Sequence, residues 1–175
     1  MCGEVEPCPI DANDDSDGDG ILDEDEGDGD TDGDGDLDFI CSYGTRSFSI
    51  WDSNGALVWD SGDSISALMA SLGEYINSYT QKRNDDKGAE PEGVVVGEMF
   101  GKTYAFVGLE RAGGILVYDV SDPTAPVFDQ YIYLPDHVSP EGLDFISAAD
   151  SPNGAAMLVV ANEVSGTVAI LQPFV

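Results

Sequence analysis

Acidic side chains at alternating positions fill the first part of the chain, and their spacing is suited to binding a cation. One stretch fits the pattern D-x-D-x-D-G-x5-E, and its members are Asp15, Asp17, Asp19, Gly20, Asp23 and Glu26. Alternate residues of a tight loop turn their carboxylates inward, and calcium takes about six to eight oxygen ligands. Gly20 permits the sharp turn, the carbonyl of Ile21 is a further ligand, and Glu26 closes the site with two oxygens. The register therefore predicts a calcium site.

The same chemistry continues on both sides of this loop with less regular spacing. A second series begins at Asp30, but Cys41 stands where the closing glutamate belongs, so this site must borrow a ligand or bind more weakly. A third, partial series precedes the first. The predicted ligands together are Asp11, Asn13, Asp15, Asp17, Asp19, Ile21, Asp23, Glu26, Asp28, Asp30, Asp32, Asp34, Asp36 and Asp38. We expect this segment to bind several calcium ions.

No amphipathic helix flanks these loops, which excludes a helix-loop-helix calcium site. The pattern resembles thrombospondin type 3 repeats, in which calcium ions take the place of a hydrophobic core. A disordered acidic linker is the alternative, because a composition rich in Asp, Gly and Ser predicts disorder. The register favours calcium, since a linker does not need Asp at alternating positions followed by Gly and Glu.

The charge of the chain is concentrated in the same segment. The 175 residues carry a net charge of −29, and residues 1–38 hold 17 of the 35 acidic side chains and none of the six basic ones. Such an excess repels itself unless cations neutralise it. A nucleic-acid partner is excluded because no basic face exists, and no apolar run reaches the length of a membrane span. The first residues are polar, so a signal peptide is absent; we expect it to have been removed, or the sequence to be an excerpt of a larger precursor.

Three cysteines lie in or beside the acidic segment, at Cys2, Cys8 and Cys41. An intramolecular disulfide, Cys8–Cys41 or Cys2–Cys8, would pin the ligand series. Free thiols are the alternative, and the odd count leaves one cysteine unassigned. A zinc site is disfavoured by the spacing and by the distance in sequence to the single histidine, His137.

The rest of the chain contains an internal repeat with a period of 49 residues, measured from Pro91 to Pro140. This is close to the period of about 50 residues in a kelch-type propeller blade. The repeated segments, in pairs, are 90–94 with 139–143, 103–110 with 156–163, and 113–118 with 165–170. Each consists of β-branched and aromatic runs separated by Gly, Asn and Pro turns, which is typical of short strands.

The sequence therefore predicts an all-β fold of β-propeller-type four-stranded blades, about three and incomplete, with an irregular calcium-binding ladder and one short helix. The middle unit has expected strands at 94–98, 103–109, 115–120 and 127–133. A weaker first unit has strands at 39–43, 48–52 and 56–60, and lacks its innermost strand; the last unit lacks its outermost one. The expected domains are 1–38 and 39–175, with a helical insertion at about 64–80.

Several motifs of this body resemble those of the choice-of-anchor I family. They occur in residues 43–51, 85–93, 108–111, 117–123 and 160–167, so that the resemblance covers about residues 40–171. The family comprises secreted or surface-attached propeller proteins, related to a biomineralisation-associated glycoprotein of sea-urchin mesenchyme. The resemblance implies an extracellular or cell-surface location and a propeller-type fold. Family members close a full propeller, whereas this chain matches only the C-terminal portion of one.

A second metal site is conceivable in the body, at carboxylates that recur at strand ends. The residues are Glu92, Glu141, Glu110 and Glu163. Gluconolactonase-like propellers use a comparable glutamate as a calcium ligand in the central channel. The favoured alternative is that these carboxylates accept backbone N–H bonds where blades meet. No nucleophile elbow, Ser/His/Asp set or phosphate loop occurs.

Two classes of function stay open. The first is a calcium-binding structural or surface protein that self-associates into oligomers or fibres through open sheet edges, with contact to surface glycan or mineral as a further expectation. The second is a calcium-dependent hydrolase of phosphate esters or lactones with its site in a central channel. The second needs a closed channel lined by several blades, so the sequence favours the first.

Overall fold

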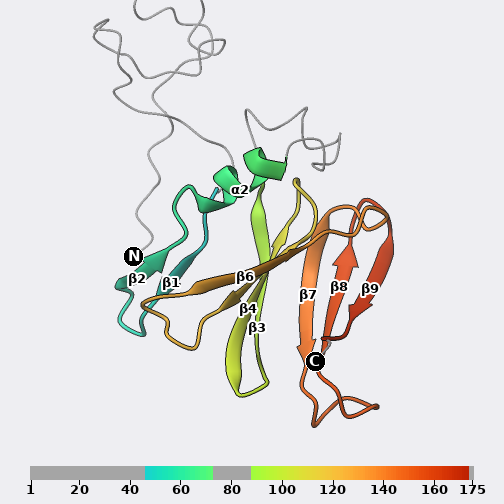
Figure 1. Cartoon of the computed structure of the whole chain (residues 1–175). Helices are drawn as coiled ribbons and strands as arrows, with labels where there is room; N and C mark the ends of the chain where they lie inside the picture. Colours follow the sequence, from blue (N-terminus) through green and yellow to red (C-terminus); the bar gives the residue numbers. More distant parts are fainter. Residues whose placement is uncertain (1–45, 73–87, 174–175) are drawn as a thin grey trace, which may run out of the picture. The chain divides into compact units, whose positions relative to one another are not determined.

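The computed structural model describes residues 46–72 and 88–173, which form three antiparallel sheets and one helix (Figure 1). The strands are β1 (Ser49–Trp51), β2 (Leu57–Asp60), β3 (Pro91–Met99), β4 (Lys102–Leu109), β5 (Ile115–Asp119), β6 (Val127–Ile132), β7 (Pro140–Ile146), β8 (Met157–Asn162) and β9 (Thr167–Leu171). The helix is α2 (Ser64–Leu72). The predicted mostly-β fold with one short helix is confirmed for these residues.

The first sheet is the hairpin of β1 and β2, and the second is the meander β3-β4-β5-β6. Asn54-Gly55 turns the hairpin, with Gly55 at φ 79°. Phe100 and Gly101, both at positive φ, turn β3 into β4. Gly113 and Gly114 lie in the left-handed region before β5, at φ 77° and 79°, where a side chain would strain the backbone. The predicted strands of the middle unit are confirmed, with ends that differ by at most three residues.

The third sheet, β7-β8-β9, repeats the register of the second. Pro140 pairs with Asn162 as Pro91 pairs with Leu109, and both first strands have a register shift after the proline. The third strands show that the predicted alignment of residues 113–118 with residues 165–170 is wrong by one residue. Ile115 lies opposite Gly108, and its counterpart opposite Ala161 is Val168. The offset between the repeats is thus the same in β4/β8 and in β5/β9.

Each face of the second sheet is covered by a different part of the chain. One face packs on α2 and on the first sheet through a cluster that includes Ile65, Leu109 and Leu116. Phe48, Trp59 and Tyr118 join it with ring centroids 5.1–5.9 Å apart. The opposite face packs on the third sheet, and this cluster is formed by Tyr104, Phe106, Ile115, Val117, Leu158, Val160 and Ala169.

Glycines of the second sheet let the third sheet approach closely. A Cβ atom on Gly93 would lie 2.5 Å from the Glu141 carbonyl oxygen and 2.7 Å from Leu143 Cδ1. A Cβ atom on Gly97 would overlap the ring of Phe145, which stacks on Phe106 at 5.7 Å. Strand β7 therefore lies directly against β3, with little side-chain volume between the two backbones, as Figure 1 shows.

Two predicted elements extend beyond the described residues. The strand at 39–43 lies wholly outside them, and so do residues 73–80 of the predicted helix. The first and last sheets have two and three strands among the described residues, so a four-stranded sheet is observed once, in the second sheet. No helix in the described part of the chain is long and apolar enough to cross a membrane.

Candidate carboxylate site

The predicted calcium ladder and all three cysteines lie in residues 1–45, outside the described residues. Its ligand set and the disulfide therefore stay predictions. The other predicted carboxylates, Glu92, Glu110, Glu141 and Glu163, lie in the described body.

Three glutamates converge where β3 begins and β4 ends. Carboxylate oxygens of Glu90, Glu92 and Glu110 lie within 4.8 Å of one another. Glu90 precedes Pro91, and its carbonyl accepts a hydrogen bond of 2.8 Å from the N–H of Glu110. The register Pro91↔Leu109 places these residues side by side. The structure thus brings together Glu92 and Glu110, and adds Glu90, which the sequence analysis missed.

Arg111 lies against this cluster and compensates part of its charge. Its Nε donates to Glu90 Oε2 at 2.7 Å, and its Nη2 lies 3.2 Å from Glu110 Oε1. All three side chains are largely shielded from water, so removing one partner would cost more than on the open surface, because it would leave a buried charge unpaired. Three carboxylates against one guanidinium still leave an excess of negative charge.

The excess negative charge affects the pKa of the Glu110 carboxyl. The pKa of its carboxyl is raised to about 7, chiefly by burial and then by the neighbouring Glu92 and Glu90, and Arg111 offsets part of this rise. The shift has two physical causes, the loss of hydration and the proximity of like charges. Near neutral pH this group is therefore shared between its acid and its carboxylate form.

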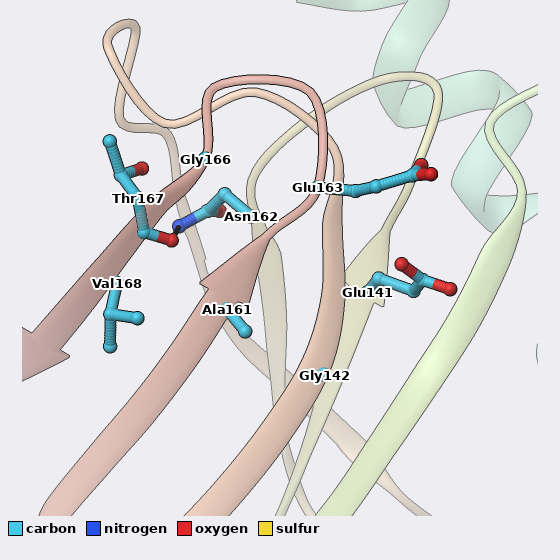
Figure 2. A pocket seen from close by; sticks show the side chains of 8 residues that line it. All are labelled: Glu141, Gly142, Ala161, Asn162, Glu163, Gly166, Thr167 and Val168. Carbon is cyan, nitrogen blue, oxygen red and sulfur yellow. Dashed lines mark hydrogen bonds between the residues drawn. The ribbon is translucent and has the colours of Figure 1, made fainter.

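The equivalent position in the third sheet has the same backbone but a different set of side chains. The N–H of Glu163 donates to the carbonyl of Ser139 at 2.8 Å, as Glu110 does to Glu90, and both acceptor residues have positive φ. Figure 2 shows Glu141 and Glu163 extending in the same direction from this sheet. Ser139 stands in the place of Glu90, so two of the three carboxylates recur. In this sheet Glu141 and Glu163 hold the positions that Glu92 and Glu110 hold in the second sheet.

A neutral polar network occupies the inner side of this second position. His137 Nδ1 lies 2.9 Å from Thr167 Oγ1, and Asn162, in the place of Leu109, lies 3.4 Å from the same ring nitrogen. Thr167 Oγ1 is in turn 2.8 Å from Ser165 Oγ. His137 is half-buried in this network.

The carboxylate site has the donor chemistry of a hard-cation site. Oxygen ligands from Glu90, Glu92 and Glu110 suit calcium, and Arg111 would have to yield part of its ion pairing to a bound ion. Without an ion, Glu90 and Glu110 pair with Arg111, and Glu92 lies beside them at the surface. Glu90 lies within the repeated segment 90–94 and Arg111 directly follows the segment 103–110, but recurrence does not single them out, because Ser139 and Val164 stand at the corresponding positions.

The fold and this site define a repeated antiparallel β protein with carboxylates at the strand ends. The profile of the choice-of-anchor I domain matches residues 10–123, and the chain belongs to that family. The match begins inside the acidic segment and ends after β5, whereas the motifs quoted above extend through β9. Membership indicates a surface-associated or extracellular protein.

Similarity to a curated relative is weaker. The chain is 26% identical over 164 residues to Gigasin-3a of Magallana gigas, covering 77% of this chain and 58% of that protein. The chain thus spans little more than half the length of that relative. No solved structure matches the chain.

Proposed function

We propose that this chain is an extracellular, calcium-binding structural protein of the cell surface that associates with copies of itself. The observation that carries the proposal is the loop register at residues 15–26, where every position of D-x-D-x-D-G-x5-E is filled. The net charge of −29 supports it, because a folded chain of this charge gains from bound cations. Membership of a surface-associated family supports the location.

The body supports a structural role better than a catalytic one. Its described residues stack three sheets with exposed apolar side chains at both ends, and its single histidine is engaged in a neutral hydrogen-bond network. The four-stranded second sheet is the form of a propeller blade, and the propeller interpretation of the whole body belongs to this proposal.

Isothermal titration calorimetry of the full chain with calcium tests the ligand series. Asp19→Ala and Glu26→Ala are each expected to abolish one binding event or weaken it at least about tenfold, since each removes a ligand. Asp25→Ala is the matched control, because it removes a carboxylate of the same loop that the register does not use as a ligand. Equal loss in Asp25→Ala would show a diffuse ion atmosphere, and unchanged binding in all three would overturn the proposal.

A second candidate function is a calcium-dependent hydrolase of phosphate esters or lactones. The observation that favours it is the convergence of Glu90, Glu92 and Glu110 around a group whose pKa is raised to about 7. Turnover of a generic phosphate ester or lactone that is lost in Glu92→Gln, but kept when the exposed Glu98 is replaced by Gln, would support this candidate over the first.

A further inference from the structure

The first and second sheets contain the same hairpin, which allows the junctions between sheets to be compared residue by residue. The hairpin of β1 and β2 has a register shift after the pair Ile50↔Trp59, and that of β5 and β6 has one after the pair Val117↔Gln130. A bulge marks a fixed point of a hairpin, so the two pairs are equivalent. Gln130 of the second sheet therefore stands in the place of Trp59 of the first.

The junction between the first and second sheets, here called the first junction, is filled by aromatic rings. The ring centroids of Trp59 and Tyr118 lie 5.9 Å apart, and Phe128 lies 5.4 Å from Tyr118. In the second junction, between the second and third sheets, Gln130 replaces Trp59. Leu171 replaces Tyr118 there, because the offset between β5 and β9 is the one established above. A counterpart of Phe128 would lie on a strand beside β9, and the described part of the third sheet has no such strand.

The smaller side chains leave a cavity of about 610 Å³ in the second junction, lined by residues of both sheets. Gln130 and Leu171 both line it. Phe106 and Phe145 form part of its wall, with their rings stacked at a centroid distance of 5.7 Å, and Leu158 lies beside them. Phe145 and Leu171 are only partly buried against the core cluster of this junction. The core between the second and third sheets therefore ends in an open, apolar cavity of the size that small ligands occupy.

The polar groups of the cavity are amides. Gln130 and Gln172 line it, and no charged side chain occurs among the described lining residues. The Oε1 atom of Gln172 accepts a hydrogen bond of 3.3 Å from Asn153 Nδ2, which leaves the amide N–H groups of Gln172 for a ligand. The net charge of −29 repels anions, and a cation would lose its hydration in the cavity without a carboxylate to pair with. The cavity therefore selects an uncharged molecule.

We propose that this cavity is a binding site for a small uncharged aromatic molecule with one hydrogen-bonding group. Its rings would take the place that Trp59 and Tyr118 take in the first junction, and would pack on Phe106 and Phe145 in the offset or edge-to-face arrangement that aromatic groups prefer. The amides of Gln130 and Gln172 would hold the polar group at the mouth. The site goes beyond the proposed function and does not depend on the predicted calcium ladder.

Fluorescence titration of the full chain tests the site with two probes that share the same rings. N-phenylnaphthylamine is uncharged and carries one N–H group, and its emission rises in apolar surroundings. Anilinonaphthalene sulfonate adds an anionic group to it. Saturable binding of the uncharged probe is expected, with the sulfonate at least about tenfold weaker because of the charge of the chain. Equal affinity of the two probes would overturn the assigned ligand class.

Two variants fill the cavity with the rings of the first junction. Leu171→Tyr copies Tyr118 and Gln130→Trp copies Trp59, and each is expected to weaken binding of the uncharged probe at least about tenfold. Val168→Tyr is the matched control, because Val168 is 62% exposed on the other face of β9 and does not line the cavity. Binding to this control should equal binding to the wild type. Melting temperatures at or above that of the wild type verify that the variants are folded.

The remaining outcomes decide against the site. Binding that is undiminished in both Leu171→Tyr and Gln130→Trp overturns the proposal, since the probe then binds elsewhere, and so does the absence of saturable binding to the wild type. Phe174 directly follows the lining residue Pro173 in the sequence, and Phe174→Ala tests it as a competing occupant. Binding at least about tenfold tighter in Phe174→Ala would show that the chain fills the cavity with its own ring, and would overturn the proposal. Unchanged affinity in this variant supports it.

Discussion

At the scale of single residues, the carboxylate site shows how burial and repetition act together. Glu92 and Glu110 were predicted because they recur in the next repeat, whereas Glu90 and Arg111 do not recur and were missed. Ser139 replaces Glu90, and the structure shows why the backbone is kept while the side chain changes: the shared feature is the carbonyl that accepts the N–H of Glu110 or Glu163. In these two contacts the acceptors are carbonyl oxygens. The favoured sequence interpretation, backbone N–H bonds to the carboxylates, stays a prediction.

The raised pKa of Glu110 predicts a pH-dependent stability in calcium-free buffer. Between the ordinary value of 4.5 and about 7, the folded protein holds a proton that the unfolded chain has lost. The free energy of unfolding therefore falls as pH rises through this window. Glu110→Gln has no carboxyl to titrate at this position and does not lose stability in this way. The free energy of unfolding of the variant, relative to that of the wild type, should therefore increase by about 1–3 kcal/mol from pH 5 to pH 8.

Urea unfolding at several pH values measures this difference, with Glu98→Gln as the control because Glu98 is an exposed glutamate of the same sheet, on β3. Parallel pH profiles for Glu110→Gln and wild type would show that the carboxyl titrates normally.

At the scale of elements, β-branched runs and glycine turns were sufficient to locate the strands. Strand β3 begins three residues earlier than predicted because the register shift after Pro91 keeps that proline paired with Leu109. The alignment of β9 was one residue out, and this error is consequential, since a slip of one residue exchanges the two faces of a strand. Only the observed pairing shows that Val168 and Ile170 lie on the outer face of the third sheet. The equivalent face of the preceding sheet is buried.

The glycines of the first strands give a matched pair of substitutions. Gly93→Ala should destabilise the fold by about 1–3 kcal/mol, because the new methyl group would overlap the carbonyl of Glu141 and the side chain of Leu143. Gly142→Ala, at the equivalent position, meets only Ala161 Cβ at 3.5 Å and should be neutral or slightly stabilising. Thermal or urea unfolding of the monomers measures both, and equal effects would contradict the repeated packing described above.

At the scale of the whole molecule, sequence predicted the separation of a charged segment from a β-rich body, but not how the body packs. Repeats reveal which strands are equivalent, whereas the burial of a side chain depends on whether another sheet or helix covers its face of the sheet. Val94 and Leu143 are equivalent in register, yet only the side chain from β7 is covered. Which of two equivalent side chains is covered could therefore be recognised only from coordinates. The net charge, by contrast, follows from composition alone and is the same in every molecule.

The net charge of −29 leads to a prediction that distinguishes bound calcium from general screening. Salts of equal ionic strength screen exposed charges to nearly the same extent, whereas an ion that binds only the folded state adds RT ln(1 + [L]/Kd) to stability. CaCl2 should therefore raise the midpoint of thermal unfolding well beyond NaCl at equal ionic strength, corresponding to about 3–4 kcal/mol at a hundred- to thousandfold excess over Kd. In the double variant Asp19→Ala/Glu26→Ala the calcium response should fall toward that of NaCl, while the NaCl response stays as in wild type, because two lost carboxylates change the total charge little. Equal midpoints in CaCl2 and NaCl for the wild-type chain would reduce the role of calcium to screening.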